Sequence, residues 1–358
     1  MPAQVYPPPR SRRVFAAAHV AATPGGAIDW EATLRFREHL WSYGFGVAEA
    51  MDTAQRGMGL SWAQARELIT RTAAHAGRGL LACGAGTDQL TAGRDHSLGE
   101  IVAAYAEQMS VVQSADAHVI LMASRALAAR ARGPRDYLEV YGELLKQADR
   151  PVILHWLGEA FDPALAGYWG GTSFETAART VLELIDRAGG QVDGIKLSLL
   201  DAGREVTLRR RLPAGVRLYT GDDFNYAELI RGDADGSYSD ALLGAFAAVT
   251  APAAAALAAL DRGDLAGYDA AMGPTVPLSR LIFEPPTYHY KVGVAFLAWL
   301  NGLQPHFAML GGLQRQRPAG HLIRVFELAA AAGALTEPEL AAGRMSEWLA
   351  RSVQTEVG

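Results

Sequence analysis

Two polar residues near the ends of apolar segments could carry out covalent chemistry. Lys196 lies near the end of the segment 192–198, and His155 lies near the end of the preceding one, 151–156. A lysine that faces an apolar interior loses solvation, so its pKa falls and its neutral amine can attack a ketone to form a Schiff base. Most lysines after an apolar run only mark a strand end, but a histidine on the preceding strand adds a proton shuttle within reach. We therefore interpret Lys196 as a nucleophile and His155 as its proton shuttle.

The alternation of apolar segments with capped helices predicts the scaffold that positions these residues. Eight strand–helix units favour an α/β fold, a parallel (β/α)8 TIM barrel, over an open doubly wound sheet. No Gly-x-Gly-x-x-Gly fingerprint follows the first expected strand, so a dinucleotide-binding fold loses its main support. Strands are expected at 14–20, 45–51, 79–85, 117–122, 151–156, 192–197 and 215–219, with a last one at or near Gly236. Helices are expected at 29–42, 61–76, 97–114, 134–148, 173–188, 201–211, 223–231 and 239–260.

Three regions are expected along the chain. Residues 1–13 form a mobile, Pro-rich amino-terminal segment, residues 14–260 form the barrel, and residues 261–358 form a C-terminal helical extension. The extension is indicated by a change to helical patterns alone, at 278–283, 291–300, 319–332 and 337–353.

Further polar residues follow the expected strands at their carboxyl ends, where a barrel of this kind gathers its active site. Asp52, Glu49 and Asp222 could accept hydrogen bonds from substrate hydroxyls, and Trp156 could stack on a sugar face. The residues that we expect to bind substrate are Glu49, Asp52, Thr53, Trp156, Ser198, Asp222 and Asp223.

Five short stretches carry motifs of a known family. Residues 23–31 read Thr-Pro-Gly-Gly-Ala-Ile-Asp-Trp-Glu, 151–155 read Pro-Val-Ile-Leu-His, 194–196 read Gly-Ile-Lys, 220–223 read Thr-Gly-Asp-Asp and 290–293 read Tyr-Lys-Val-Gly. They resemble, in this order, the "TPF-dG-iDwe", "PvilYNvP", "GiK", "sGdD" and "vKaal" motifs of the dihydrodipicolinate synthase and N-acetylneuraminate lyase superfamily of Schiff-base-forming class I aldolases. The resemblance extends from about Val14 to Gly302 and indicates a divergent branch of that superfamily.

The resemblance implies a role for particular residues. Lys196 becomes the imine-forming lysine, and Lys291 in the last motif becomes a structural residue and not a second catalytic one. No cofactor is expected beyond the lysine itself. A homodimer or homotetramer is expected.

The departures from the family pattern limit the substrate. The family's "GTTGE" loop, which holds a pyruvate carboxylate, is here the stretch 51–55, and only Thr53 is retained. Asp52 in that loop would repel a carboxylate beside it. His155 replaces the family's strand-five tyrosine, and the arginine of the synthases falls near Ala160. Dihydrodipicolinate synthase activity is therefore not expected, and pyruvate should be a poor partner.

We expect a carbon–carbon or carbon–oxygen lyase, an aldolase or dehydratase, that acts on a keto acid or a keto-sugar-like substrate in carbohydrate metabolism. One alternative is a metal-dependent sugar isomerase, in which five residues at the barrel mouth would bind a divalent cation: His19, Glu49, Asp52, Asp88 and His155. The other alternative is a catalytically silent relative that keeps the barrel.

Composition excludes several other classes. The 358 residues include 33 basic and 38 acidic ones, so no excess of positive charge indicates a nucleic-acid partner. No apolar run is long enough for a membrane span, and we expect a cytoplasmic protein whose partner is a small carbonyl compound. The single cysteine, Cys83, excludes an intramolecular disulfide and cysteine-based metal clusters.

Overall fold

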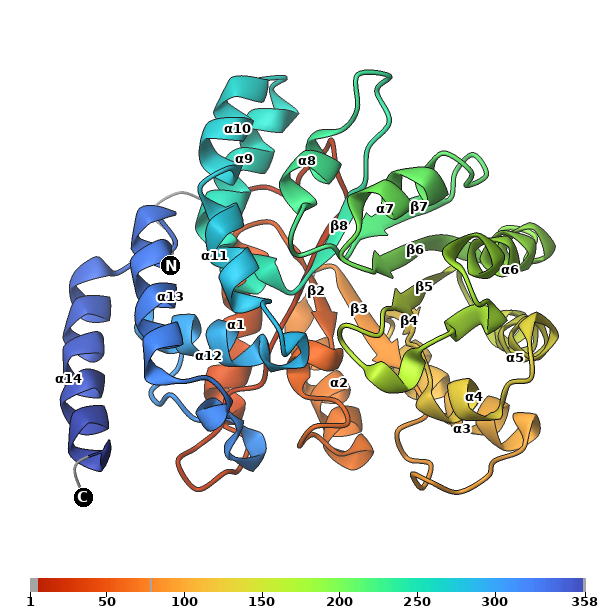
Figure 1. Cartoon of the computed structure of the whole chain (residues 1–358), viewed down its shortest axis with the longest axis horizontal. Coiled ribbons are helices and arrows are strands. Elements are labelled where there is room, and N and C mark those ends of the chain that lie inside the picture. The colour runs from red at the N-terminus through yellow and green to blue at the C-terminus, as the bar shows by residue number, and fades with distance from the viewer. Residues whose placement is uncertain (1–5, 78, 357–358) are drawn as a thin grey trace.

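Eight short parallel strands close into a barrel in the computed structural model, which describes residues 6–77 and 79–356 (Figure 1). The strands follow one another around the barrel in chain order, and the last pairs with the first. The predicted (β/α)8 barrel is therefore confirmed. The strands are β1 (Val14–Ala17), β2 (Gly46–Glu49), β3 (Leu81–Ala85), β4 (His118–Leu121), β5 (Val152–Leu157), β6 (Val192–Ser198), β7 (Arg217–Thr220) and β8 (Asp240–Leu243).

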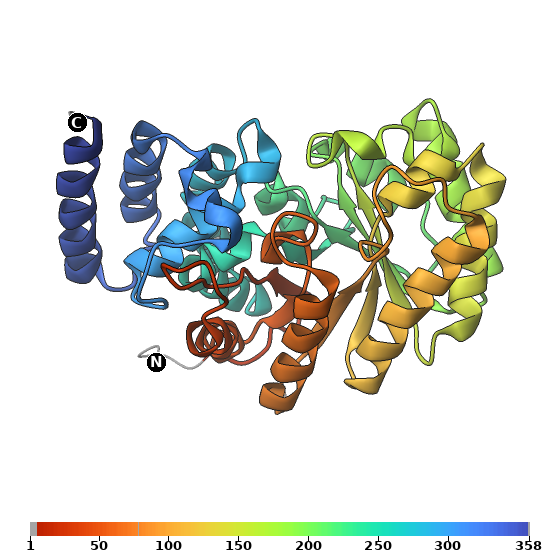
Figure 2. The same ribbon diagram turned by 90° about the horizontal axis from the view of Figure 1, so that it is seen from below.

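Helices on the outside of the barrel connect successive strands, and Figure 2 shows several of them side by side around it. Ser61, Ser97 and Ser173 precede three of these helices, and each forms a reciprocal capping box with the residue three positions later. The connecting helices are α1 (Trp30–Ser42), α2 (Trp62–Ala76), α3 (Leu98–Ser114), α4 (Arg125–Arg130), α5 (Pro134–Gln147), α6 (Phe174–Arg187), α7 (Ala202–Arg209) and α8 (Tyr226–Arg231), and α9 (Thr250–Asp261) follows the last strand.

The C-terminal extension consists of helices that lie on the side of the barrel away from α5 and α6 (Figures 1 and 2). Every residue of its third helix, α12, is buried, so α12 is the apolar centre of the extension. The short helices α4 and α10 are not among the predicted elements. The helices of the extension are α10 (Leu265–Met272), α11 (Thr275–Ile282), α12 (Lys291–Leu300), α13 (Ala319–Ala331) and α14 (Pro338–Glu356).

The eighth strand corrects one prediction. Residues 239–260 were expected to form one helix, but Asp240–Leu243 is β8 and the helix α9 begins only at Thr250. Ala241 pairs with Val14 and Leu243 pairs with Ala16, so this segment closes the barrel. All four residues of β8 are buried, so they lack the alternation that identifies a half-buried strand, and their sequence merges with the Ala-rich helix that follows.

Part of the Pro-rich amino-terminal segment is attached to the barrel. The backbone N–H groups of Arg10 and Ser11 donate to the carboxylate of Asp261, the last residue of α9. Residues 1–5, to which the predicted mobility also applied, lie outside the described residues.

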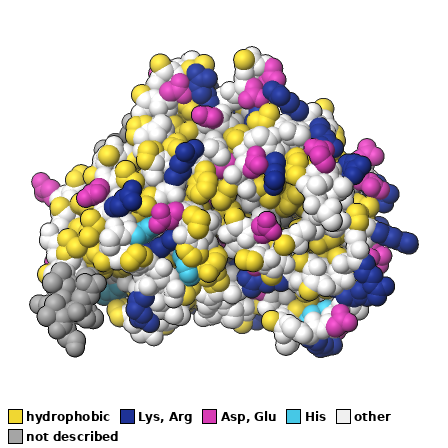
Figure 3. Space-filling model, viewed as in Figure 1, with side chains coloured by type: hydrophobic (Ala, Val, Ile, Leu, Met, Phe, Trp, Pro, Cys, Tyr) yellow, Lys and Arg dark blue, Asp and Glu magenta, His cyan; other side chains and the backbone are white. Residues whose placement is uncertain are grey.

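The surface carries both signs of charge. Figure 3 shows Lys and Arg side chains interspersed with Asp and Glu side chains on the face seen there. No helix within residues 6–77 and 79–356 is long and apolar enough to cross a membrane.

The barrel interior is filled by one apolar layer below the polar residues of the mouth. Because side chains alternate between the two faces of a strand, Ile153 and His155 of β5 both point inward, as do Gly194, Lys196 and Ser198 of β6. The apolar layer is formed by Phe15, Ala17, Ala48, Met51, Ala82, Ile120, Ile153, Tyr219 and Leu242. Lys196 therefore stands on an apolar floor.

Glu49, the last residue of β2, is held in a buried ion pair and not at the barrel mouth. Its carboxylate accepts two hydrogen bonds of 2.8 Å from the guanidinium of Arg37 on α1, and a third from Thr72 on α2. Both charged side chains are completely buried. Glu49 therefore fixes α1 and α2 against β2, and the expectation that it binds substrate is corrected.

The Arg37–Glu49 pair yields the first prediction. Replacing Glu49 with alanine leaves the Arg37 guanidinium buried without its counter-ion, and we expect the free energy of unfolding to fall by about 3–5 kcal/mol. The matched control is Glu31→Ala, which breaks the exposed pair with Arg35 one turn away on α1 and should change stability by about 0.5 kcal/mol or less. Urea denaturation measures both; equal effects of the two substitutions would contradict this role.

Candidate active site

Lys196 lies at the centre of the candidate site. On β6 it pairs with His155 of β5 on one side and with Tyr219 of β7 on the other. Its side chain is buried, and its amine forms no hydrogen bond or ion pair within the part of the chain that the structure describes. Burial lowers the pKa of Lys196, although the carboxylates of Asp52 and Asp223 act in the opposite direction. A desolvated amine without a partner is available to attack a carbonyl carbon.

His155 is placed beside this lysine by the register of β5 and β6. Its Nε2 lies 3.3 Å from the hydroxyl oxygen of Ser198, and its Nδ1 is buried without a hydrogen-bond partner among the described residues. Burial, aided by the charge of Lys196, holds the pKa of His155 well below its usual range. The imidazole is therefore neutral at pH 7 and can accept a proton on whichever ring nitrogen carries no hydrogen.

Gly221, directly after β7, provides the space in which the Lys196 side chain lies. A Cβ atom at this position would come within 2.8 Å of Cε of Lys196 and within 2.2 Å of Oγ of Ser198. No residue with a side chain fits there without displacing both. Gly221 is part of the motif at 220–223, but no role was predicted for it from the sequence.

Asp52 and Thr53 follow β2 in the short 3-10 helix η1 (Asp52–Ala54) and meet a residue from the C-terminal extension. The hydroxyl of Tyr290 donates to Asp52 over 2.7 Å and lies 2.5 Å from the hydroxyl of Thr53. Burial acts to raise the pKa of Asp52, but the positive charges of Lys196 and Lys291 lower it overall. Asp52 is therefore ionised, and its other oxygen is buried without a partner among the described residues.

Asp223 and Asp222 follow β7 but differ in environment. Asp223 is buried, and one of its oxygens accepts a 2.9 Å hydrogen bond from the backbone N–H of Ala245. Burial raises the pKa of Asp223 to about 8, against the opposing charge of Lys196. Asp223 is therefore protonated at pH 7 and can act as an acid. Asp222 instead accepts from the backbone N–H groups of Phe224 and Asn225 and supports the turn that leads into α8.

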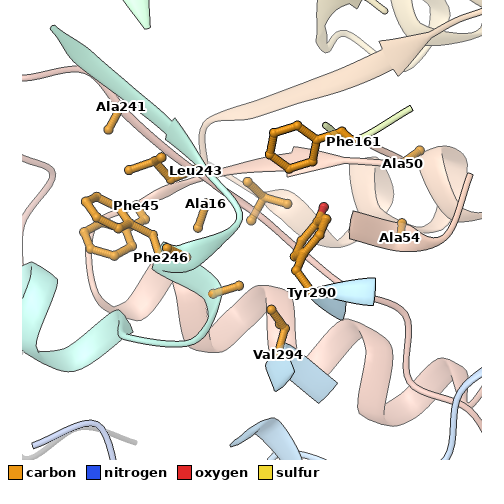
Figure 4. Close-up of a cluster of buried hydrophobic side chains, with 14 of the residues drawn as sticks. Ala16, Phe45, Ala50, Ala54, Phe161, Ala241, Leu243, Phe246, Tyr290 and Val294 are labelled. Atoms are coloured by element: carbon orange, nitrogen blue, oxygen red, sulfur yellow. The ribbon is translucent and has the colours of Figure 1, made fainter. Parts of the chain in front are cut away.

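Three aromatic side chains pack together beside Asp52. The ring of Tyr290 stacks on Phe283 with centroids 4.3 Å apart, and Phe161 meets Tyr290 edge to face at 6.1 Å. Figure 4 shows the rings of Phe161 and Tyr290 close to one another, near Ala50 and Ala54. Phe161 lies in the connection after β5, and the two other rings come from the extension. Barrel and extension therefore enclose the site together.

Trp156 is placed away from this site. Its ring stacks on Phe174 of α6 with centroids 5.6 Å apart, and Trp169 contacts its edge. Since His155 points into the barrel, the next residue on the strand must point outward to the helices. The expectation that Trp156 stacks on a sugar is therefore corrected.

The five residues of the alternative metal site are not brought together. His19 forms a 2.7 Å hydrogen bond with Gln304, Glu49 pairs with Arg37, and Asp88 pairs with Arg56. Across residues 6–77 and 79–356, no three His, Cys, Asp or Glu side chains are grouped closely enough to hold a metal ion.

Tyr290 is not among the site residues predicted from the sequence, although it precedes Lys291 in the motif at 290–293. The hydrogen bonds of Tyr290 to Asp52 and Thr53 join positions more than 230 residues apart. A resemblance in the Tyr-Lys-Val-Gly stretch was the one signal that could have pointed to it.

The space at Gly221 yields a prediction about stability. Gly221→Ala forces Lys196 and Ser198 out of place in a closely packed site, and we expect a loss of about 1–3 kcal/mol in the free energy of unfolding. The control is Gly142→Ala on α5, where a Cβ would meet nothing within 4 Å and alanine is the better helix former. Thermal denaturation should show a lower midpoint for the first variant and an equal or higher one for the second. A Gly221→Ala variant as stable as the wild type would show that the site is loosely packed.

Comparison with solved structures shows the same fold in the dihydrodipicolinate synthases. A candidate dihydrodipicolinate synthetase from Pseudomonas aeruginosa is similar with a TM-score of 0.70 and 16% identity, over 90% of this chain and 99% of that one. The dihydrodipicolinate synthase from Thermotoga maritima is similar with a TM-score of 0.68 and 16% identity, over 91% and 100% of the two chains. The enzyme from Oceanobacillus iheyensis gives a TM-score of 0.68 and 16% identity, over 90% and 96%. At this identity the likeness establishes the fold alone.

Comparison at the level of sequence gives the family. The comparison with curated proteins found no match. A family model described as "Protein of unknown function (DUF993)" matches residues 2–353. The chain therefore belongs to the DUF993 family, a family that this structure shows to have the barrel fold of the dihydrodipicolinate synthases.

Proposed function

We propose that this protein is an imine-forming lyase in which Lys196 attacks the ketone of a sugar-like substrate. The observation that carries the proposal is the buried amine of Lys196, which has no partner among the described residues and stands between a neutral histidine and two carboxyl groups. The likeness to the dihydrodipicolinate synthases supports it, because those proteins use the same barrel.

Imine formation needs a nucleophile and an acid. The nitrogen of Lys196 bonds to the carbonyl carbon while the electrons of the C=O double bond move to oxygen, which gains a proton to give a carbinolamine. Asp223, with a pKa raised to about 8 by burial, is protonated and can give a proton to the departing hydroxyl group. Water leaves, and the protonated imine remains on Lys196.

The protonated imine then accepts the electrons of the bond that breaks. In aldol cleavage, His155 takes the proton of the hydroxyl group two carbons from the imine carbon. The carbon–carbon bond breaks, its electron pair moves toward the imine to give an enamine, and the other fragment leaves as an aldehyde. The enamine carbon takes the proton back from His155, and water releases the product and restores the amine. In dehydration, His155 removes a proton from the carbon next to the imine carbon and gives it to the hydroxyl group on the following carbon, which then leaves as water.

The remaining polar groups favour a substrate that carries hydroxyl groups. The free oxygen of Asp52 and the hydroxyl of Ser198 can form hydrogen bonds with such groups. The ionised Asp52 disfavours a carboxylate directly next to the reacting ketone. Pyruvate is therefore a poor substrate in this scheme.

Trapping of the imine tests the proposal. Sodium borohydride reduces an imine to a stable amine, so incubation with a keto sugar such as L-sorbose should add the mass of the sugar less one oxygen atom to the peptide that contains Lys196. Pyruvate should add little, because Asp52 repels its carboxylate. The chain has only three lysines, Lys146, Lys196 and Lys291, so peptide mass spectrometry assigns the adduct without ambiguity.

Two variants control this experiment. Lys196→Ala should lose the adduct, and Lys146→Met, which changes an exposed lysine on α5, should keep it. Full labelling of Lys196 by pyruvate would overturn the interpretation of Asp52. Absence of any adduct at Lys196 with keto sugars and keto acids alike would overturn the imine mechanism.

The role of His155 gives a separate prediction. An enamine exchanges the protons next to the former carbonyl with solvent, so a bound ketone should take up deuterium in D₂O, as NMR can follow. His155→Phe should slow this exchange by about a hundredfold, the usual scale for a general acid–base group, and should leave trapping at Lys196 intact. His306→Phe, at an exposed histidine outside the barrel, is the control and should exchange at the normal rate. An unchanged exchange rate in His155→Phe would show that His155 transfers no proton and has only a packing role.

A further inference from the structure

The distribution of the three lysines points to a second functional amine. The sequence holds 33 Lys and Arg residues, and only three of them are lysines. Lys146 is exposed, whereas Lys196 and Lys291 are 5% and 3% exposed and both lie at the barrel mouth. Nearly all surface cations of this chain are arginines, whereas two of its three lysines lie buried in the same site.

Lys291 carries a charge that the described residues do not neutralise. Its amine donates to the carbonyl of Tyr288 at 3.2 Å and lies 3.8 Å from the sulfur of Met58. No ion pair joins it to a carboxylate in the described part of the chain. A buried ammonium group whose close neighbours are a carbonyl, a thioether and the neutral ring of Tyr290 loses more solvation energy than it recovers from them. An anion bound beside Lys291 would compensate for this lost solvation energy.

Two further features support an anion beside Lys291. Burial lowers the pKa of Lys291 to about 8, with Asp52 opposing the shift, so the amine is still mainly protonated at pH 7. Lys291 is also the first residue of the ten-residue helix α12, whose positive end adds to its charge.

Tyr290 and Asp52 connect the surroundings of the two buried lysines. The amine of Lys291 lies 4.5 Å from the centre of the Tyr290 ring, and the hydroxyl of that ring binds Asp52. The charge of Asp52 acts on both lysines, whereas the other charges near Lys196 and near Lys291 belong to different residues. Asp52 is therefore the carboxylate whose charge acts on both amines.

We propose that Lys291 is an anion subsite that binds a carboxylate of the substrate several carbons away from the ketone that reacts with Lys196. This inference rests on the proposed role of Lys196. Formation of the protonated imine fixes a positive charge on the nitrogen of Lys196, which Asp52 can balance, and a carboxylate at Lys291 then balances the second cation. One negative charge on the substrate is therefore enough to balance the charges of the site. A 2-keto acid is too short, because its carboxylate would lie against Asp52 and not beside Lys291.

Matched pairs of carbonyl compounds test the position of the charge. 5-Keto-D-gluconate differs from L-sorbose only by a carboxylate in place of a terminal CH₂OH group, four carbons from the ketone. Pyruvate differs in the same way from hydroxyacetone, but at the carbon next to the ketone. With borohydride at constant ionic strength, the wild type should trap 5-keto-D-gluconate at least about tenfold faster than L-sorbose, which corresponds to about 1.4 kcal/mol. Pyruvate should show no such advantage over hydroxyacetone.

Variants of Lys291 assign the effect. Lys291→Met should lose the advantage of 5-keto-D-gluconate and still trap L-sorbose, which shows that the site is folded. Lys291→Arg keeps the charge and should keep part of the advantage, and Lys146→Met should behave as the wild type. Equal trapping of 5-keto-D-gluconate and L-sorbose by the wild type, or an advantage that survives in Lys291→Met, would overturn the subsite.

A binding measurement separates this inference from the proposed reaction. D-Gluconate has no ketone, so it can occupy the anion subsite but cannot form an imine. It should raise the melting temperature of the wild type and of Lys196→Ala, but not that of Lys291→Met, and neutral D-glucitol at the same concentration should not reproduce this pattern. No shift with D-gluconate in the wild type overturns the subsite. A shift with D-gluconate, together with no trapping of any ketone at Lys196, retains the subsite and overturns the lyase.

Discussion

The withdrawal of the Lys196 amine from water is the constraint on which the rest of the site depends. An ammonium group is costly in an apolar interior, so burial favours the neutral amine, which is also the reactive form. The closed barrel supplies the apolar floor, Gly221 supplies the space, and the register of β5 and β6 places His155 beside the amine. The apolar floor and the space at Gly221 together keep the amine of Lys196 out of water. An exposed lysine at the same position would stay protonated.

Charge balance explains the other residues of the mouth. Asp52 stays ionised because the two lysines act on it, while Asp223 is protonated because burial dominates. At pH 7 the site therefore holds a neutral imidazole and a protonated carboxyl group beside a lysine whose pKa is lowered by burial. Tyr290 fixes Asp52 from the C-terminal extension, so the extension completes the site and does not merely cover the barrel.

The sequence was sufficient for what depends on local pattern, and insufficient for what depends on distant contacts. The alternation of apolar segments and capped helices predicted the barrel, and the motif around Lys196 located the candidate nucleophile. The outward direction of Trp156 could have been predicted from the sequence, because successive side chains on a strand point to opposite faces and His155 was already expected to point inward. The burial of Glu49 by Arg37 and the bond of Tyr290 to Asp52 depend on the packing of α1 and the extension, and no local pattern contains that information.

The pH dependence of Lys196 reactivity shows whether the amine of Lys196 is desolvated. Competitive acetylation with trace acetic anhydride, with a free amine as internal standard, gives a separate titration curve for each lysine peptide. We expect the curve of Lys196 to inflect at a pH below 10.5, the usual pKa of a lysine, because its amine is desolvated. An inflection at or above 10.5 would mean that the amine is kept charged by its neighbours, and it would contradict the assignment of Lys196 as the nucleophile.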